Sequence, residues 1–230
     1  MNTAMKQTSV VQQMVWKDIQ LHRIHILATM ICGFVALALL LFKREASTYF
    51  GMLVFFIALV LVGCLLASSN ILNERKKQTL PFMMSLPISS IQYTTSKLMG
   101  TVVMFMIPWL TLLVAVVWEI AVKSVLPHGL IPLTVIVLML PFVALCGITA
   151  MTLVGETEGW SIAGNVVFNS SYSLVWPFMM RIPALTRDMG GNQAVWNSTV
   201  LTILASEFGA IVLILAVTYY LQSRKRDFIF

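Results

Sequence analysis

Long apolar stretches alternate with short polar ones along almost the whole chain. A helix that spans the hydrocarbon core of a bilayer needs about 20 mostly apolar residues. Candidate spans run over residues 24–42, 49–69, 98–122, 130–154, 161–182 and 199–221. Their apolar residues are continuous rather than alternating, which argues against a transmembrane β-barrel. The pattern predicts an all-α integral membrane protein with about six transmembrane helices.

A shorter amphipathic stretch, residues 10–23, precedes the first candidate span. Its apolar residues recur with helical spacing, and polar residues occupy the other face. The apolar positions are Val11, Met14, Val15 and Ile19, and the polar ones are Gln13, Lys17 and Gln20. This pattern predicts a helix lying on the membrane surface, with Trp16 at headgroup level. The alternative is that the stretch simply begins the first transmembrane helix.

These elements predict three parts of the chain. Residues 1–23 form a cytoplasmic tail with the interfacial helix, and residues 24–222 form a six-helix transmembrane domain. A polar cytoplasmic loop, residues 70–97, follows the second span, and residues 223–230 form a basic cytoplasmic tail. The first residues lack the apolar core and cleavage site of a signal peptide, so the first span is expected to direct insertion.

The distribution of Lys and Arg predicts the orientation. Cytoplasmic loops of membrane proteins carry an excess of these residues. With the N-terminus inside, the inner side holds Lys6, Lys17, Arg23, Arg75, Lys76, Lys77, Lys97, Arg224, Lys225 and Arg226. The outer side holds Lys43, Arg44, Lys123, Arg181 and Arg187. The excess on the inner side places both termini in the cytoplasm.

Composition supports a membrane environment. The 230 residues are 59% hydrophobic and only 10% charged, whereas soluble domains carry roughly 25% charged residues. The net charge of +6 comes from short basic clusters between apolar runs, which is typical of membrane loops and not of nucleic-acid binding. The cysteines, Cys32, Cys64 and Cys146, all fall within apolar runs and are expected to behave as small hydrophobic residues.

Motifs for catalysis are missing from the sequence. It contains no G-x-x-x-x-G-K-[ST] loop, so no ATP hydrolysis by the P-loop route is expected of this chain. It also lacks the H-E-x-x-H and G-x-S-x-G motifs. His22 and His25 share a helical face, but a metal site needs further ligands, and interfacial polar residues are the preferred interpretation. We therefore expect neither catalytic residues nor a metal site.

The loop after the second span has a distinctive sequence. A charged start that includes Glu74 is followed by a short apolar patch, and Pro87 ends any helix there. The patch comprises Leu80, Phe82, Met83, Met84 and Leu86. It is too short to span a membrane and is suited to lying flat on one or filling a groove on a partner. A soluble partner is therefore expected to bind here.

This loop resembles the corresponding loop of ABC-2 type transporter permeases. The resemblance rests on Glu74-Arg75, Thr79-Leu80, the run from Met83 through Ser85, Leu86 and Pro87 to Ser89, and then Lys97. Chain length, six spans, an interfacial N-terminal helix and a basic C-terminal tail also agree with that family, whose fold is that of type V exporters. The loop departs from the family pattern at Lys76, Gln78 and Pro81.

The resemblance implies a half-transporter in a bacterial plasma membrane. Two permease chains, identical or related, would pair, and each would bind a separate ATP-binding subunit that carries ATP and Mg. The implied contact residues are Glu74, Thr79, Leu80, Phe82, Met83, Ser85, Leu86 and Pro87. Glu156 and Glu158, in the next inner loop, would form a second contact or merely cap the fifth span. The direction of transport, export of a cargo, is implied by the resemblance alone.

Polar residues inside the spans are candidates for a substrate path. Asn165, Asn169 and Ser173 recur every four residues and share one face of the fifth span. They would line a path or hydrogen-bond to a neighbouring helix. Glu207 lies in the sixth span between Ala205 and Gly209, small residues that allow close helix approach and would shield it from lipid. It is expected to face a cavity, a partner or another helix, or to be protonated.

Two other classes of protein remain open on the sequence alone. A stand-alone channel or ion-coupled carrier would need no ATPase, but the spans contain few ionisable groups and no evident inverted repeat. An intramembrane enzyme would need a nucleophile or metal motif, which is missing. The apolar patch of the loop favours the permease, because a stand-alone carrier has no use for it. The cargo is not specified by any motif.

Overall fold

The computed structural model describes residues 2–42, 45–76, 90–123, 126–155 and 157–224, and the side chains of residues 11–42, 46–72, 91–123, 126–155 and 157–224. Within these ranges the chain is helical apart from short turns, and no β-strand occurs. The helices are α1 (Asn2–Leu40), α2 (Glu45–Lys76), α4 (Ser90–Lys123), η1 (His128–Leu130), α5 (Ile131–Gly155), α6 (Glu158–Met180), α7 (Pro183–Thr186) and α8 (Ser198–Arg224). The prediction of an all-α protein is confirmed for these residues.

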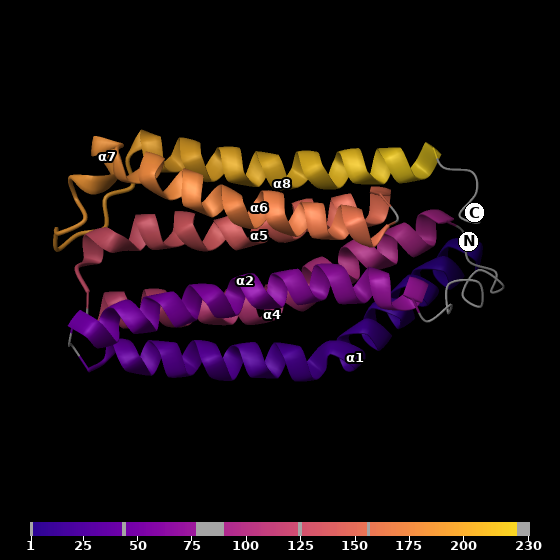
Figure 1. Ribbon diagram of the computed structural model, residues 1–230, viewed down its shortest axis with the longest axis horizontal. Helices are drawn as coiled ribbons and strands as arrows, with labels where there is room; N and C mark the ends of the chain where they lie inside the picture. Colours follow the sequence, from indigo (N-terminus) through magenta and orange to yellow (C-terminus); the bar gives the residue numbers. More distant parts are fainter. Residues whose placement is uncertain (1, 43–44, 77–89, 124–125, 156, 225–230) are drawn as a thin grey trace.

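The long helices lie side by side along one axis of the molecule, and consecutive ones run in opposite directions (Figure 1). The start of α1 and the end of α8 lie at the same end of the bundle, and α7 lies at the opposite end (Figure 1). α1, α2 and α4 form one group, and α5 joins this group to α6 and α8. An indole hydrogen bond, from Trp109 Nε1 of α4 to the Leu138 carbonyl of α5 (2.6 Å), ties the two groups.

Five helical segments are long and apolar enough to cross a membrane. They are Val11–Leu40, Ala46–Leu72, Ile91–Lys123, His128–Gly155 and Ser198–Arg224. α6 coincides with the predicted span 161–182 and has 23 residues, but it is not among the five. Its polar residues, which include Asn165 and Asn169, lower its apolarity. The structure thus supports five spans, and the sixth stays a prediction.

α6 nevertheless packs closely on α5. A Cβ atom added at Gly147 of α5 would lie 2.0 Å from the ring of Phe168 of α6. At Gly164 of α6, a Cβ would lie 3.3 Å from Met151 of α5. Small residues of this kind let two helices approach more closely than larger side chains allow. Glycine at these two positions therefore explains how a helix with so many polar residues stays in the bundle.

The helices extend further than the apolar runs of the sequence. α1 is a single helix, so residues 11–23 continue directly into the span and bury Met14, Asp18 and His22 within the bundle. α2 continues to Lys76 and α4 already begins at Ser90, so much of the predicted loop 70–97 is helical. These extensions are possible because polar side chains on them bind one another between the helices.

Candidate functional site

Three helices meet in a buried polar cluster near the end of the bundle that holds the start of α1. Asp18 of α1, Asn70 of α2 and Lys97 of α4 supply its centre. The Lys97 Nζ lies 2.9 Å from Asp18 Oδ2 and donates a second hydrogen bond to Asn70 Oδ1 (3.1 Å). The side chains of Lys97 and Asp18 are 0% and 1% exposed. Lys and Asp are almost never buried to this degree unless they are paired.

Neutral hydrogen bonds extend the cluster. Asn70 Nδ2 donates to Thr101 Oγ1 of α4 (2.9 Å), and His22 Nε2 of α1 lies 2.9 Å from Ser69 Oγ of α2. His22 Nδ1 donates to the Asp18 carbonyl (3.0 Å), which fixes the ring on its own helix. We call this group the three-helix polar cluster. It consists of Asp18, His22, Ser69, Asn70, Lys97 and Thr101.

The surroundings of the ion pair leave little room for a different arrangement. The Lys97 ammonium lies 5.9 Å from the centre of the Tyr93 ring. Asp18 Oδ1 accepts no hydrogen bond from the described residues, but the half-exposed Lys17 ammonium lies 3.5 Å from it. A Cβ at Gly100 would be in ordinary contact with Asp18 Oδ2, at 3.6 Å. The carboxylate is thus enclosed by two ammonium groups and closely packed atoms.

The cluster lies close to the segment predicted to bind a partner. Asn70 precedes the end of α2 at Lys76, and Lys97 follows the start of α4 at Ser90. With a rise of 1.5 Å per residue, both side chains are about 10 Å along the helices from the segment 77–89. The cluster therefore fixes the last turns of α2 and the first turns of α4, which precede and follow residues 77–89 in the chain.

Most residues predicted to contact the partner lie outside the described residues. These are Thr79, Leu80, Phe82, Met83, Ser85, Leu86, Pro87 and Glu156. Glu74 belongs to α2, but its side chain also lies outside them. Glu158 is exposed in the first turn of α6, where a carboxylate interacts favourably with the helix dipole. The predicted partner contact therefore stays a prediction.

The predicted polar face of α6 is directed at α2. Asn165 Nδ2 donates to Ser68 Oγ (3.2 Å), and Asn169 Nδ2 approaches Cys64 Sγ at 3.2 Å. Ser68 Oγ lies 3.1 Å from Ser161 Oγ. We call these contacts the α2–α6 ladder. Of the two predicted alternatives for Asn165 and Asn169, interhelical hydrogen bonding is the one seen in this chain.

Ser173 does not belong to the ladder. It is exposed on the surface of α6, although its spacing predicted a face shared with Asn165 and Asn169. Of the three residues of α6 predicted to line a substrate path, one is therefore exposed and the other two bond to α2.

Glu207 is buried on the side of α8 that faces the bundle. It is 8% exposed, and neither carboxylate oxygen accepts a hydrogen bond from the described residues. The predicted shielding by small residues is not seen, because Ala205 and Gly209 are exposed and nothing lies within 4 Å of a Cβ at Gly209. The carboxylate is covered from the opposite side of the helix.

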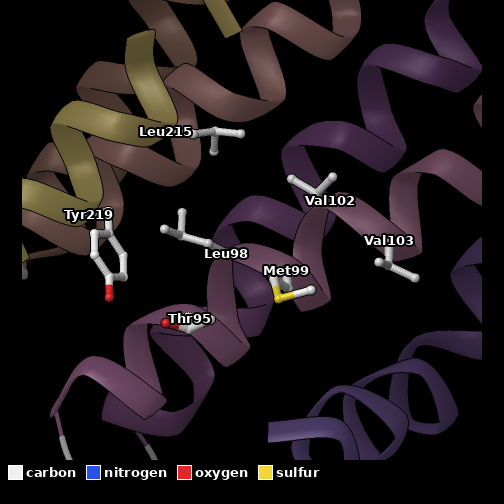
Figure 2. A pocket seen from close by; sticks show the side chains of 7 residues that line it. All are labelled: Thr95, Leu98, Met99, Val102, Val103, Leu215 and Tyr219. Carbon is white, nitrogen blue, oxygen red and sulfur yellow. The ribbon is translucent and has the colours of Figure 1, made fainter. Parts of the chain in front are cut away.

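An open groove of about 320 Å³ lies between α4 and α8 (Figure 2). Aliphatic side chains and one methionine form most of its walls, and Thr95 and Tyr219 contribute apolar surface to the rest. The groove is lined by Thr95, Leu98, Met99, Val102, Val103, Leu215 and Tyr219. None of the residues predicted for a substrate path lines it.

No group of three or more His, Cys, Asp or Glu side chains in the described part of the chain is arranged to hold a metal ion. His22 and His25 have ring centres 5.9 Å apart, but His22 is bonded to Ser69 and to the Asp18 carbonyl. His22 is therefore part of the helix packing, whereas His25 is exposed.

Sequence reasoning missed the central residue of the cluster, Asp18. Its position carried a recognisable pattern, since Asp18 follows Met14 by four residues and so falls on the apolar face of the predicted amphipathic helix. A carboxylate on such a face needs a buried partner. Lys97 is that partner, 79 residues further along the chain.

Comparison of the chain with models of known protein families, with curated proteins and with solved structures finds no match.

Proposed function

We propose that this chain is the transmembrane permease subunit of an ATP-driven ABC-2 type transporter, an exporter that moves its cargo through a dimer of such chains. The observation that carries the proposal is the position of the three-helix polar cluster. It fixes both helices that flank the segment 77–89, and that segment has the permease-like loop sequence. A loop anchored in this way is suited to transmit a partner's movement to the helices.

In this proposal the chain supplies the pathway and a separate subunit supplies ATP hydrolysis. The apolar patch of the segment, with Leu80 and Phe82, fills a groove on the ATP-binding subunit. Closure of two such subunits around ATP and Mg then rocks the helices of the two permease chains. Glu158, exposed at the start of α6, adds a contact at the same end of the bundle.

The arrangement of the helices supports a common side for both termini, which in this proposal is the cytoplasmic side of a bacterial plasma membrane. The start of α1 and the end of α8 lie at one end of the bundle, together with the ends of α2 and α4 that flank the segment 77–89 (Figure 1). Lys17, Lys97 and Arg224, which belong to the set of Lys and Arg predicted for the inner side, are on the helix parts at this end. This orientation places the partner-binding segment on the side where ATP is available.

Co-purification with candidate P-loop ATPases tests the proposal. The chain is expressed with each candidate, purified in nanodiscs, and analysed for an ATPase that elutes with it in a fixed ratio. Leu80→Asp and Phe82→Asp are expected to abolish this association, because each places a charge in the apolar patch. Gln193→Asp, in an exposed turn at the opposite end of the bundle, is the control and is expected to retain it.

A contrary result has a defined form. If no ATPase binds, and the chain alone exchanges or conducts solutes in liposomes, the chain is a stand-alone channel or ion-coupled carrier. Glu207 would then be the first residue to examine, since ionisable residues within spans often mark ion pathways and its buried carboxylate accepts no hydrogen bond from the described residues.

A further inference from the structure

The three-helix polar cluster connects each pair of its helices. Asp18 and Lys97 link α1 to α4, Lys97 and Asn70 link α4 to α2, and His22 and Ser69 link α1 to α2. Every link is between side chains far apart in the sequence. Three helices joined pairwise at one level cannot shift separately without breaking at least two links.

Stability alone does not account for a buried ion pair. Removing two charges from water is unfavourable, and well-packed apolar residues in place of such a pair are often equally or more stabilising. Apolar residues are buried at the same level of the helices, since Ile71 and Leu98 directly follow Asn70 and Lys97 in the sequence and belong to one apolar cluster. What an ion pair adds is a strict geometry, since displacing a buried ammonium group from its carboxylate loses a strong interaction that water cannot replace there.

We propose that Asp18 and Lys97 are positioning residues that fix α1 to the bases of α2 and α4, so that the three helix ends move as one body. The inference rests on the proposed function in one respect only, namely that the displacement comes from an ATPase bound to the segment 77–89. The ion pair would then carry that displacement into α1, which has no direct part in the loop.

Hydrogen exchange of the chain alone, in nanodiscs, tests the mechanical part of the proposal without any ATPase. Asp18→Asn and Lys97→Met are each expected to speed amide exchange in residues 11–22 and 91–101 by on the order of tenfold or more. The double variant is expected to exchange no faster than the faster single variant, because the second change removes a partner that is already lost. Arg23→Met, which removes an exposed cation of α1, is the control and is expected to leave exchange unchanged.

A disulfide between α1 and α4 tests whether holding the helices together is the function of the pair. Val15 Cγ2 lies 3.9 Å from a Cβ built at Gly100, so Val15→Cys and Gly100→Cys place two thiols in reach of each other. The background lacks Cys32, Cys64 and Cys146, each replaced by alanine.

In the complex with the ATPase, Asp18→Asn is expected to lower transport per ATP hydrolysed by about tenfold while ATPase binding persists.

Oxidation of the engineered thiols is expected to restore transport per ATP in the Asp18→Asn variant, and reduction is expected to abolish it again. A merely structural role would change the amount of folded protein and not this ratio. Failure of the disulfide to restore coupling would overturn the positioning role. Additive exchange effects, or unchanged exchange in both single variants, would overturn it as well. If no ATPase binds the unaltered chain, the proposed function fails, and the exchange result still decides whether the pair holds the helices.

Discussion

α2 takes part in two polar regions, each shared with different neighbouring helices, and the two regions are built from different chemical groups. The three-helix polar cluster joins it to α1 and α4 through a buried ion pair. The α2–α6 ladder joins it to α6 through amides, hydroxyls and one thiol that are partly buried. Adjacent residues of α2 serve the two regions, since Ser68 belongs to the ladder and Ser69 to the cluster.

The two regions differ in what remains when an interhelical bond breaks. In the ladder, Asn165 and Asn169 each also donate to a carbonyl four residues earlier in α6, at 2.9 and 2.8 Å. Each amide therefore keeps a partner if α6 moves away from α2. Lys97 has its short bonds to Asp18 and Asn70, both on other helices. We therefore expect α6 to shift on α2 at a lower cost than α1, α2 and α4 shift against one another at the cluster.

The largest expected effect comes from removing one charge of the cluster. Asp18→Ala removes the carboxylate that lies 2.9 Å from the buried Lys97 ammonium and is expected to lower the free energy of unfolding by about 3–5 kcal/mol. Thermal unfolding in detergent measures the change. Glu158→Ala removes an exposed carboxylate and is expected to change stability by less than about 1 kcal/mol. Equal losses of stability in the two variants would show that the buried ion pair tolerates substitution as well as an exposed carboxylate does.

A side chain added at a glycine tests how α6 is held without altering any polar group. Gly147→Leu places its Cβ 2.0 Å from the Phe168 ring and forces α6 away from α5, at a cost of about 1–3 kcal/mol. Labelling of Cys64 by a thiol reagent, followed by mass spectrometry, is expected to become faster because Asn169 no longer covers it. Gly209→Leu, where a Cβ meets no atom within 4 Å, is expected to leave both stability and labelling unchanged. Unchanged labelling in Gly147→Leu would mean that α6 is not held by this contact.

The same substitution in both regions sharpens the comparison. Asn70→Leu leaves the Lys97 ammonium with one acceptor fewer and is expected to lower the free energy of unfolding by about 1–3 kcal/mol. Asn165→Leu removes one interhelical bond of the ladder and is expected to lower it by only about 0.6 kcal/mol, the average for such bonds in membrane proteins. Unfolding of the two variants under identical detergent conditions compares them. A larger loss in Asn165→Leu would reverse the assignment of the fixed and the adaptable region.

The sequence predicts the helices better than their contacts. All six predicted segments are helical except for residues 41–42 and 181–182, because long apolar runs leave the backbone no other way to satisfy its hydrogen bonds in lipid. Whether α6 spans the membrane is not evident from its sequence, because its asparagines and serines lower its apolarity. How closely α6 packs depends on glycines of another helix, such as Gly147. Asp18 and Lys97 could not be paired from one sequence, since residues 79 positions apart meet only through the tertiary arrangement of α1 and α4. The exposure of Ser173 could not be predicted for the same reason. Helical periodicity shows which residues share a face of a helix but not which neighbouring helix covers that face.

The smallest effect on stability is expected at Ser173, which is exposed and outside the ladder. Ser173→Ala should change the free energy of unfolding by no more than about 0.5 kcal/mol, as surface substitutions usually do.

Ser173→Trp tests the predicted substrate path, because a large side chain on a path lined by α6 would obstruct it. Leu174→Trp is the matched control, since Leu174 is the next residue, is 66% exposed and has the apolar character of a lipid-facing position. Transport by the reconstituted complex is expected to fall in Ser173→Trp and to persist in Leu174→Trp. Equal transport in both variants would place Ser173 on the same lipid-facing surface as Leu174 and remove it from the path, and the adaptable contact of α6 with α2 would then serve packing alone.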